Sequence, residues 1–172
     1  MRRGFLNTLS GRFLILTVVF VMLAEILIFV PSIARFRADF MLTRLKQAQI
    51  AALTQLATED MIMPELEAEL LKNAEVFNVV LRRNEVRQLV LSSPLPDAIH
   101  ETYDLRMAGP WELIRDAFSC LLDSQNRIIR VIGYPVQDAG TLIEVTMETQ
   151  SLRDAMVDYG LRILLLSALI SA

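Results

Sequence analysis

The sequence predicts an α+β domain held between two membrane-inserted helices. Three observations support this: two apolar stretches frame the chain, helical periodicity adjoins each stretch, and short β-rich runs lie between them. We expect a long N-terminal helix continuous with a transmembrane helix, an antiparallel sheet of about five strands with flanking helices, and an exit helix into a second transmembrane helix.

The first apolar stretch, residues 13–30, is the predicted first transmembrane helix. Its 18 residues contain one charge, Glu25. A hydrocarbon core of roughly 30 Å takes about 20 helical residues to cross, so the stretch and its flanks are long enough. Its apolar run exceeds the roughly 7–15 residues of a signal-peptide core, and no A-x-A site follows. We interpret it as an uncleaved anchor rather than a cleaved signal peptide.

The second apolar stretch begins near Tyr159 and is still apolar at Ala172. We interpret residues 159–172 as the start of a second transmembrane helix that is cut off at the end of the chain. The remaining divisions are a cytoplasmic arm at 1–12 and a single domain at 31–158, which is of ordinary domain size.

The distribution of charge predicts the orientation of the chain. Arg2, Arg3 and Arg12 precede the first apolar stretch with no acid among them, whereas residues 31–158 hold 13 Lys and Arg against 19 Asp and Glu, a net charge of −6. By the positive-inside rule the N-terminus stays in the cytoplasm and 31–158 is exported, which in a bacterium means an inner-membrane protein with a periplasmic domain. An acidic exported domain argues against a nucleic-acid partner.

Two helices are predicted at the start of this domain. From Pro31, apolar residues recur at three- to five-residue steps for about 25 residues, and we expect this helix to continue from the membrane helix with a possible kink at Pro31. Its exposed stripe would need a partner helix, which favours a dimer. A second helix is expected at 64–75, with Asp60 capping its approach and Pro64 in its first turn. The apolar stripe of the first helix consists of Ile33, Phe36, Phe40, Leu45, Ala48, Ala52, Leu53 and Leu56.

Five strands are predicted in the second half of the domain. Residues 76–83 and 86–92 read as a hairpin that turns at 84–85, and residues 118–123 and 127–132 read as a second hairpin. A last strand is expected at 141–147, after a turn at 138–140. Residues 98–106 are expected to form a short helix or loop, residues 111–117 a short helix, and the chain reads as helical again from Ser151.

The order of these elements resembles the extracytoplasmic PAS-like (Cache-type) sensor domains of bacterial receptors. LLDSQNRIIR (121–130) is similar to a strand–turn–strand of that family, and IEVTMETQSLRDAMVDYGLRIL (143–164) resembles the last sensor strand and exit helix of alphaproteobacterial sensor histidine kinases. RFLILTVVFVMLAEILIFVPSIA (12–34) resembles their first membrane helix. Taken with the order of elements between them, the resemblance extends over most of the chain.

The resemblance implies a homodimeric two-component sensor in the inner membrane that responds to an unknown small-molecule or envelope ligand. A signal in the periplasmic domain would set an autokinase, and through it a cognate response regulator. The chain itself has no phospho-acceptor helix and no ATP-binding boxes, so ATP and Mg are expected only for a kinase region outside it, and no cofactor is expected within it. Its motifs include no nucleophile signature, so no catalytic residue is expected.

The resemblance also implies a ligand pocket between the two hairpins. Tyr103, Arg106, Trp111 and Arg115 fall there and suit a small anionic or aromatic ligand. The alternative interpretation puts Trp111 in the core and the arginines on the solvated surface.

Two charges in the membrane segments invite a second hypothesis. Glu25 and Arg162 lie at comparable depths from the outer face, and intramembrane ionisable residues are often functional. We hypothesise that they pair, within one subunit or across a dimer, and couple the two helices. The alternative is that Glu25 is protonated or reaches the interface and that Arg162 reaches the headgroups.

Two further residues, His100 and Cys120, are expected to have no special function. His100, the only histidine, lacks a second His or Cys at ligand spacing, so no metal site is predicted; we expect a solvated residue, with a pH-sensing role as the alternative. Cys120, the only cysteine, is expected to be a small buried side chain, with a redox-sensing thiol as the alternative. Rival functions for the whole chain are a membrane-anchored scaffold and a sensor module of a chemoreceptor or a cyclic-dinucleotide enzyme.

Overall fold

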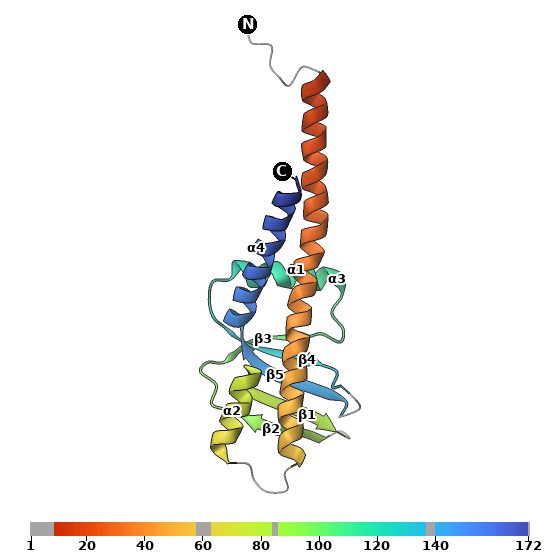
Figure 1. Cartoon of the computed structure of the whole chain (residues 1–172). Coiled ribbons are helices and arrows are strands. Elements are labelled where there is room, and N and C mark those ends of the chain that lie inside the picture. Colours follow the sequence, from red (N-terminus) through yellow and green to blue (C-terminus); the bar gives the residue numbers. More distant parts are fainter. Residues whose placement is uncertain (1–8, 58–62, 84–85, 137–139, 172) are drawn as a thin grey trace.

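The computed structural model shows an α+β protein and describes residues 9–57, 63–83, 86–136 and 140–171. A long helix leads into a mixed domain, and a second helix leaves it in the direction from which the first came (Figure 1). The elements are α1 (Leu9–Ala57), α2 (Pro64–Ala74), β1 (Asn78–Arg83), β2 (Val86–Ser92), β3 (Ile99–Asp104), α3 (Pro110–Leu122), β4 (Ile128–Gly133), β5 (Leu142–Glu148) and α4 (Thr149–Ser171).

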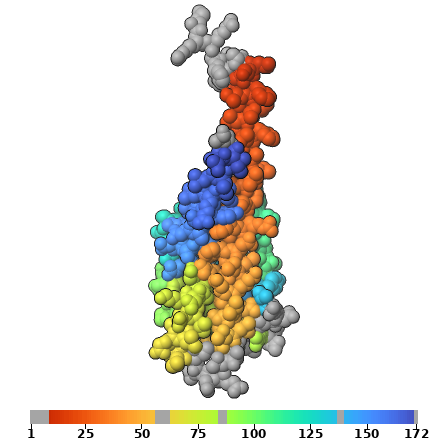
Figure 2. All heavy atoms as spheres, in the orientation of Figure 1, coloured from red at the N-terminus to blue at the C-terminus, as the bar shows by residue number. Residues whose placement is uncertain are grey.

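Helix α1 is one continuous helix of 49 residues with Pro31 inside it. At 1.5 Å per residue its length is about 74 Å, which is far longer than the domain. The N-terminal part stands clear of every other described segment, whereas the C-terminal part lies against the sheet (Figure 2). The expected continuity of the membrane helix and the first domain helix is therefore confirmed.

The helix buries its apolar stripe within its own domain. Ile33, Met41, Leu45 and Ala48 are each 0–2% exposed, and α1 packs against α3, α4 and the sheet. Helices α3 and α4 and the sheet cover much of this stripe, so it does not by itself require a helix from a second copy. Dimerisation stays a prediction that this stripe no longer supports.

The sheet has five strands in the order β2-β1-β5-β4-β3. The β1–β2 hairpin is confirmed, and β1–β5 and β5–β4 are also antiparallel, but β3 pairs with β4 in parallel. The sheet is therefore mixed, and the expectation of an antiparallel sheet was wrong at this edge. The parallel pair arises because α3 carries the chain back from the end of β3 to the start of β4.

Two segments have the opposite structure to the one expected. Residues 98–106, expected as a helix or loop, contain β3, and residues 118–123, expected as a strand, lie almost wholly in α3. A short apolar run such as 118–122 fits either a helix or a strand by its pattern alone. Here the run extends an amphipathic helix that places Ala117 in the core. The second predicted hairpin is therefore a helix followed by a strand.

The other predicted elements are observed with small shifts at their ends. Helix α2 and strand β5 agree with the sequence analysis, and α4 begins two residues before Ser151. The predicted cap Asp60 and the turn at 84–85 lie outside the described residues, as do positions 138 and 139 of the last turn.

One face of the sheet packs on α1 and forms the core. Register places Ile129 opposite Met147 and Val131 opposite Val145, and Val145 is also opposite Val79. Helix and sheet approach closely at Gly133, where a Cβ atom would lie 2.5 Å from a methyl carbon of Leu45. The inward row consists of Val79, Leu81, Ile129, Val131, Ile143, Val145 and Met147, all 0–2% exposed.

Helix α1 is also long and apolar enough to cross a membrane. The candidate span is Leu9–Gln55; its most apolar 18-residue window has a mean hydropathy of 3.0 and none of that window is buried. Within the described part of the chain, α1 is the one helix that meets these conditions. The second transmembrane helix expected at 159–172 falls on the exposed apolar end of α4 and stays a prediction.

Candidate functional site

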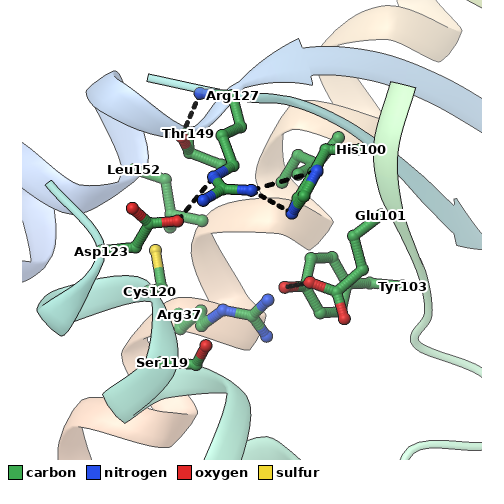
Figure 3. A pocket seen from close by; sticks show the side chains of 11 residues that line it. Arg37, His100, Glu101, Tyr103, Ser119, Cys120, Asp123, Arg127, Thr149 and Leu152 are labelled. Carbon is green, nitrogen blue, oxygen red and sulfur yellow. Dashed lines mark hydrogen bonds and ion pairs between the residues drawn. The ribbon is translucent and has the colours of Figure 1, made fainter. Parts of the chain in front are cut away.

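A cavity of about 240 Å³ lies where β3, β4, α3 and the start of α4 meet α1 (Figure 3). Its walls come from five elements that are far apart in the sequence. Both long helices contribute to it, α1 through Arg37 and α4 through Thr149 and Leu152. The other lining residues are His100, Glu101, Tyr103, Ser119, Cys120, Asp123, Arg127 and Ile129.

Arg37 is the most unusual side chain in this cavity. It is 1% exposed, and its guanidinium carbon lies 4.2 Å from the centre of the Tyr103 ring. Among the described residues, its Nε and Nη2 atoms have no hydrogen-bond partner. Figure 3 shows the guanidinium pointing along the cavity towards Tyr103, with Ser119 and Cys120 beside it. A buried cation thus faces the cavity with part of its hydrogen-bonding capacity unused.

Tyr103 and Glu101 form the β3 side of the cavity. The Tyr103 hydroxyl donates to Glu101 Oε2 at 2.5 Å. Burial of the ring, with this hydrogen bond and the nearby carboxylates, raises the pKa of Tyr103 well above its usual range, although Arg37 opposes the shift. The phenol therefore stays neutral, and one oxygen of Glu101 is occupied.

Cys120 lines the cavity from α3 and is partly buried. Burial raises the pKa of its thiol, and the neighbouring Arg37 guanidinium reduces the shift without reversing it. A raised pKa gives little thiolate, whereas a reactive cysteine needs a lowered one. This environment does not favour the redox-sensing alternative.

Arg127 closes the opposite end of the cavity. Its Nε lies 2.7 Å from Asp123 Oδ2, and its guanidinium also contacts the ring of His100. The Arg127 backbone N–H donates to the Thr149 hydroxyl at 2.9 Å, at the first residue of α4. Asp123 and Arg127 therefore neutralise one another at the point where the exit helix begins. His100 is exposed on β3, not on a helix as expected.

The four residues predicted to bind a ligand do not all line one cavity, although Arg115 shares one cavity with Tyr103 and another with Trp111. Tyr103 lines the cavity, but Arg106 lies outside it and holds Asp104 through two hydrogen bonds of 2.9 and 2.6 Å. Trp111 is 80% exposed, so its alternative placement in the core was wrong. Arg115 is paired with Asp116 at 3.0 Å.

Arg115 lines a second cavity of about 450 Å³ between β3 and α3. Arg37, Glu101 and Tyr103 line this cavity as well as the first, so these three side chains lie between the two.

Sequence reasoning missed Arg37, although a signal was present. Arg37 was not among the candidate residues, because it falls between the apolar positions of the first domain helix. Ile33, Arg37, Met41 and Leu45 follow one another at four-residue steps, which puts all four on one helix face. The arginine therefore lies in the middle of the buried stripe.

Above the cavity, α1 and α4 are joined by specific contacts. The hydroxyls of Ser32 and Tyr159 are hydrogen-bonded at 2.8 Å, and the rings of Phe36 and Tyr159 stack with centroids 4.2 Å apart. Gly160 is buried where α4 passes Phe29: a Cβ at Gly160 would lie 3.5 Å from that ring. The two helices therefore leave the domain as a packed pair.

Glu25 and Arg162 each contact another residue of this helix pair. Ser167 donates to Glu25 Oε1 at 2.8 Å, and Arg162 pairs with Asp158 at 2.6 Å. Glu25 thus connects α1 to α4, but through a serine hydroxyl. The Glu25–Arg162 pair stays a prediction.

The described residues contain no group of three or more His, Cys, Asp or Glu side chains arranged to hold a metal ion. The cavity chemistry is that of arginine, tyrosine and paired carboxylates, which suits recognition of a ligand.

Comparison with known proteins gives no match to a protein-family model, to a curated protein or to a solved structure.

Proposed function

We propose that the chain is the signal-sensing module of a membrane-bound two-component sensor histidine kinase. Its α+β domain binds a ligand, and α1 and α4 carry the change to a cytoplasmic kinase region. The observation that carries this proposal is that one cavity touches both long helices, through Arg37 of α1 and through Thr149 and Leu152 of α4.

This contact provides a physical route for a signal. A ligand can shift an equilibrium only by binding one conformation better than another. A ligand in this cavity contacts α1 and the first turn of α4 together, so it favours the relative position of the two helices that fits it best. The packed pair above the cavity, which includes the Ser32–Tyr159 hydrogen bond, transmits that position towards the apolar ends.

The charge distribution supplies the orientation. With Arg2, Arg3 and Arg12 at the N-terminus, the positive-inside rule favours a cytoplasmic N-terminus and a periplasmic domain in the bacterial inner membrane. A homodimer and a cognate response regulator belong to the same proposal. The resemblance of residues 143–164 to the exit segment of sensor histidine kinases favours this output over that of a chemoreceptor or a cyclic-dinucleotide enzyme.

The test is a distance measurement between the two helices. Spin labels replace Arg35 on α1 and Val157 on α4, both exposed, in the full chain with Cys120 changed to Ala. Pulsed electron resonance in lipid nanodiscs gives the distance with and without fractionated growth medium. We expect a fraction that displaces or narrows the Arg35–Val157 distribution.

A label pair within α1, at Arg35 and Ile50, is the matched control. These positions lie about 22 Å apart along one helix, so their distance should stay constant. If the Arg35–Val157 distribution is the same with every fraction, the sensor proposal is wrong and a static membrane-anchored scaffold is the better interpretation.

A further inference from the structure

The charge of Arg37 has no counter-ion in the described structure. A guanidinium stays protonated in proteins, and this one is 1% exposed. None of the ion pairs formed by the described residues includes Arg37. Buried charges are normally paired, because leaving water is costly for an ion. Arg37 is therefore a buried cation that lacks a partner anion among the described ion pairs.

The neighbours of Arg37 do not provide that anion. Tyr103 and Cys120 both stay neutral, because burial raises the pKa of each group. Glu101 is a carboxylate that lines the same cavity, but its Oε2 accepts the Tyr103 hydroxyl and none of the ion pairs of the described residues joins it to Arg37. The two other nearby carboxylates have arginine partners of their own: Asp116 pairs with Arg115, and Asp123 pairs with Arg127.

The two unpartnered atoms of Arg37 are Nε and Nη2. These nitrogens lie on the same side of a guanidinium and present parallel N–H bonds, which match the two oxygens of a carboxylate. The Tyr103 ring covers the flat face of the guanidinium at 4.2 Å, which leaves the edges for in-plane acceptors. The unused donors are therefore the pair that binds a carboxylate bidentately.

We propose that this cavity binds a small carboxylate anion through the guanidinium edge of Arg37. This inference names the ligand class of the proposed sensor site, and its role in signalling rests on that function. The cavity, at about 240 Å³, is smaller than the roughly 300–1,000 Å³ of pockets for drug-sized ligands, so the ligand is a small molecule. Nε and Nη2 are buried, so binding through them requires the Arg37 side chain to turn towards the cavity.

The test is direct binding of named carboxylates to the full chain in lipid nanodiscs. Saturation-transfer NMR is recorded with acetate and with succinate. A third measurement with inorganic phosphate tests whether a non-planar oxyanion binds instead. We expect saturable binding of at least one carboxylate. Arg37→Lys keeps the positive charge but loses the two parallel N–H donors, so it should weaken that binding at least about tenfold. Arg44→Lys, on the same helix but paired with Glu75 and lining neither cavity, should leave it unchanged.

A second measurement locates the site without any substitution. Cys120 is the only cysteine of the chain and lines the same cavity, so a bound carboxylate should slow its alkylation by iodoacetamide. Sodium chloride at equal ionic strength is the control. This readout stands even if Arg37→Lys does not fold.

Three results would overturn the inference: neither carboxylate binds, phosphate binds but the carboxylates do not, or the bound carboxylate leaves Cys120 alkylation unchanged. Failure of the proposed function looks different. If a carboxylate binds and protects Cys120 while the Arg35–Val157 distance stays constant, the binding site stands and the sensor proposal falls. If a medium fraction shifts that distance and no carboxylate binds, the ligand class alone is wrong.

Discussion

Replacing Arg37 by methionine should stabilise the domain when no anion is bound. The substitution keeps an unbranched side chain of similar reach and removes two buried donors without partners, Nε and Nη2. Each unsatisfied buried donor costs about 1–3 kcal/mol. Loss of the contact with the Tyr103 ring offsets about 1–2 kcal/mol of that gain. The two donors together account for about 2–6 kcal/mol, so we expect the free energy of unfolding to rise by up to about 5 kcal/mol.

Pulse proteolysis of the full chain in nanodiscs, over a range of urea concentrations, measures this change. The matched control is Arg44→Met on the same helix, where the arginine is paired with Glu75 at 2.5 Å. This control should lose up to about 1 kcal/mol, since one end of the pair is solvent-exposed. A loss of stability for Arg37→Met that equals or exceeds the loss for Arg44→Met would refute the reasoning, because Arg37 would then have favourable partners.

Three further perturbations test the packing and the electrostatics. Gly133→Ala puts a Cβ 2.5 Å from the buried Leu45 side chain and should cost about 1–3 kcal/mol by overpacking; a urea midpoint equal to that of the wild type would contradict the close approach of α1. Hydrogen bonding and attraction from Arg106 hold the pKa of Asp104 below its usual value of 3.8, so the carboxylate stabilises the fold at neutral pH and this contribution is lost as the pH falls through the lowered pKa. Asp104→Asn should therefore lower the urea midpoint at pH 7, and this difference should shrink as the pH falls through the lowered pKa; a difference that does not depend on pH would count against the pair. Glu25→Leu removes the acceptor for a hydroxyl of α4 and should broaden the spin-label distances between α1 and α4, whereas Glu25→Gln keeps an acceptor oxygen and should not; equal broadening in both would mean that the charge itself matters.

Local pattern was sufficient for the elements whose signals are strong within one segment. The apolar run at 13–30, the β1–β2 hairpin and strand β5 are each specified by their own composition and periodicity. The continuity of α1 through Pro31 was expected for the same reason, since helical periodicity resumes directly after it.

Pattern failed where pairing with distant residues decides the structure. Strand β3 is an edge strand with mostly polar residues, and its conformation depends on its parallel partner β4. The run at 118–122 fits a helix or a strand equally well, and the burial of Ala117 and its neighbours under α1 decides for the helix. Such non-local contacts leave no mark in the segment itself.

The sequence by itself determined the class of this protein: a long, apolar N-terminal helix joined to an acidic α+β domain. It also placed Tyr103 among the candidate ligand residues. Only the tertiary structure decided that Arg37 belongs with it, because burial of a helix face depends on what packs against that face. The sheet, α3 and α4 enclose the side of α1 that carries Arg37. An arginine that looks solvated in the sequence becomes a buried charge facing a cavity.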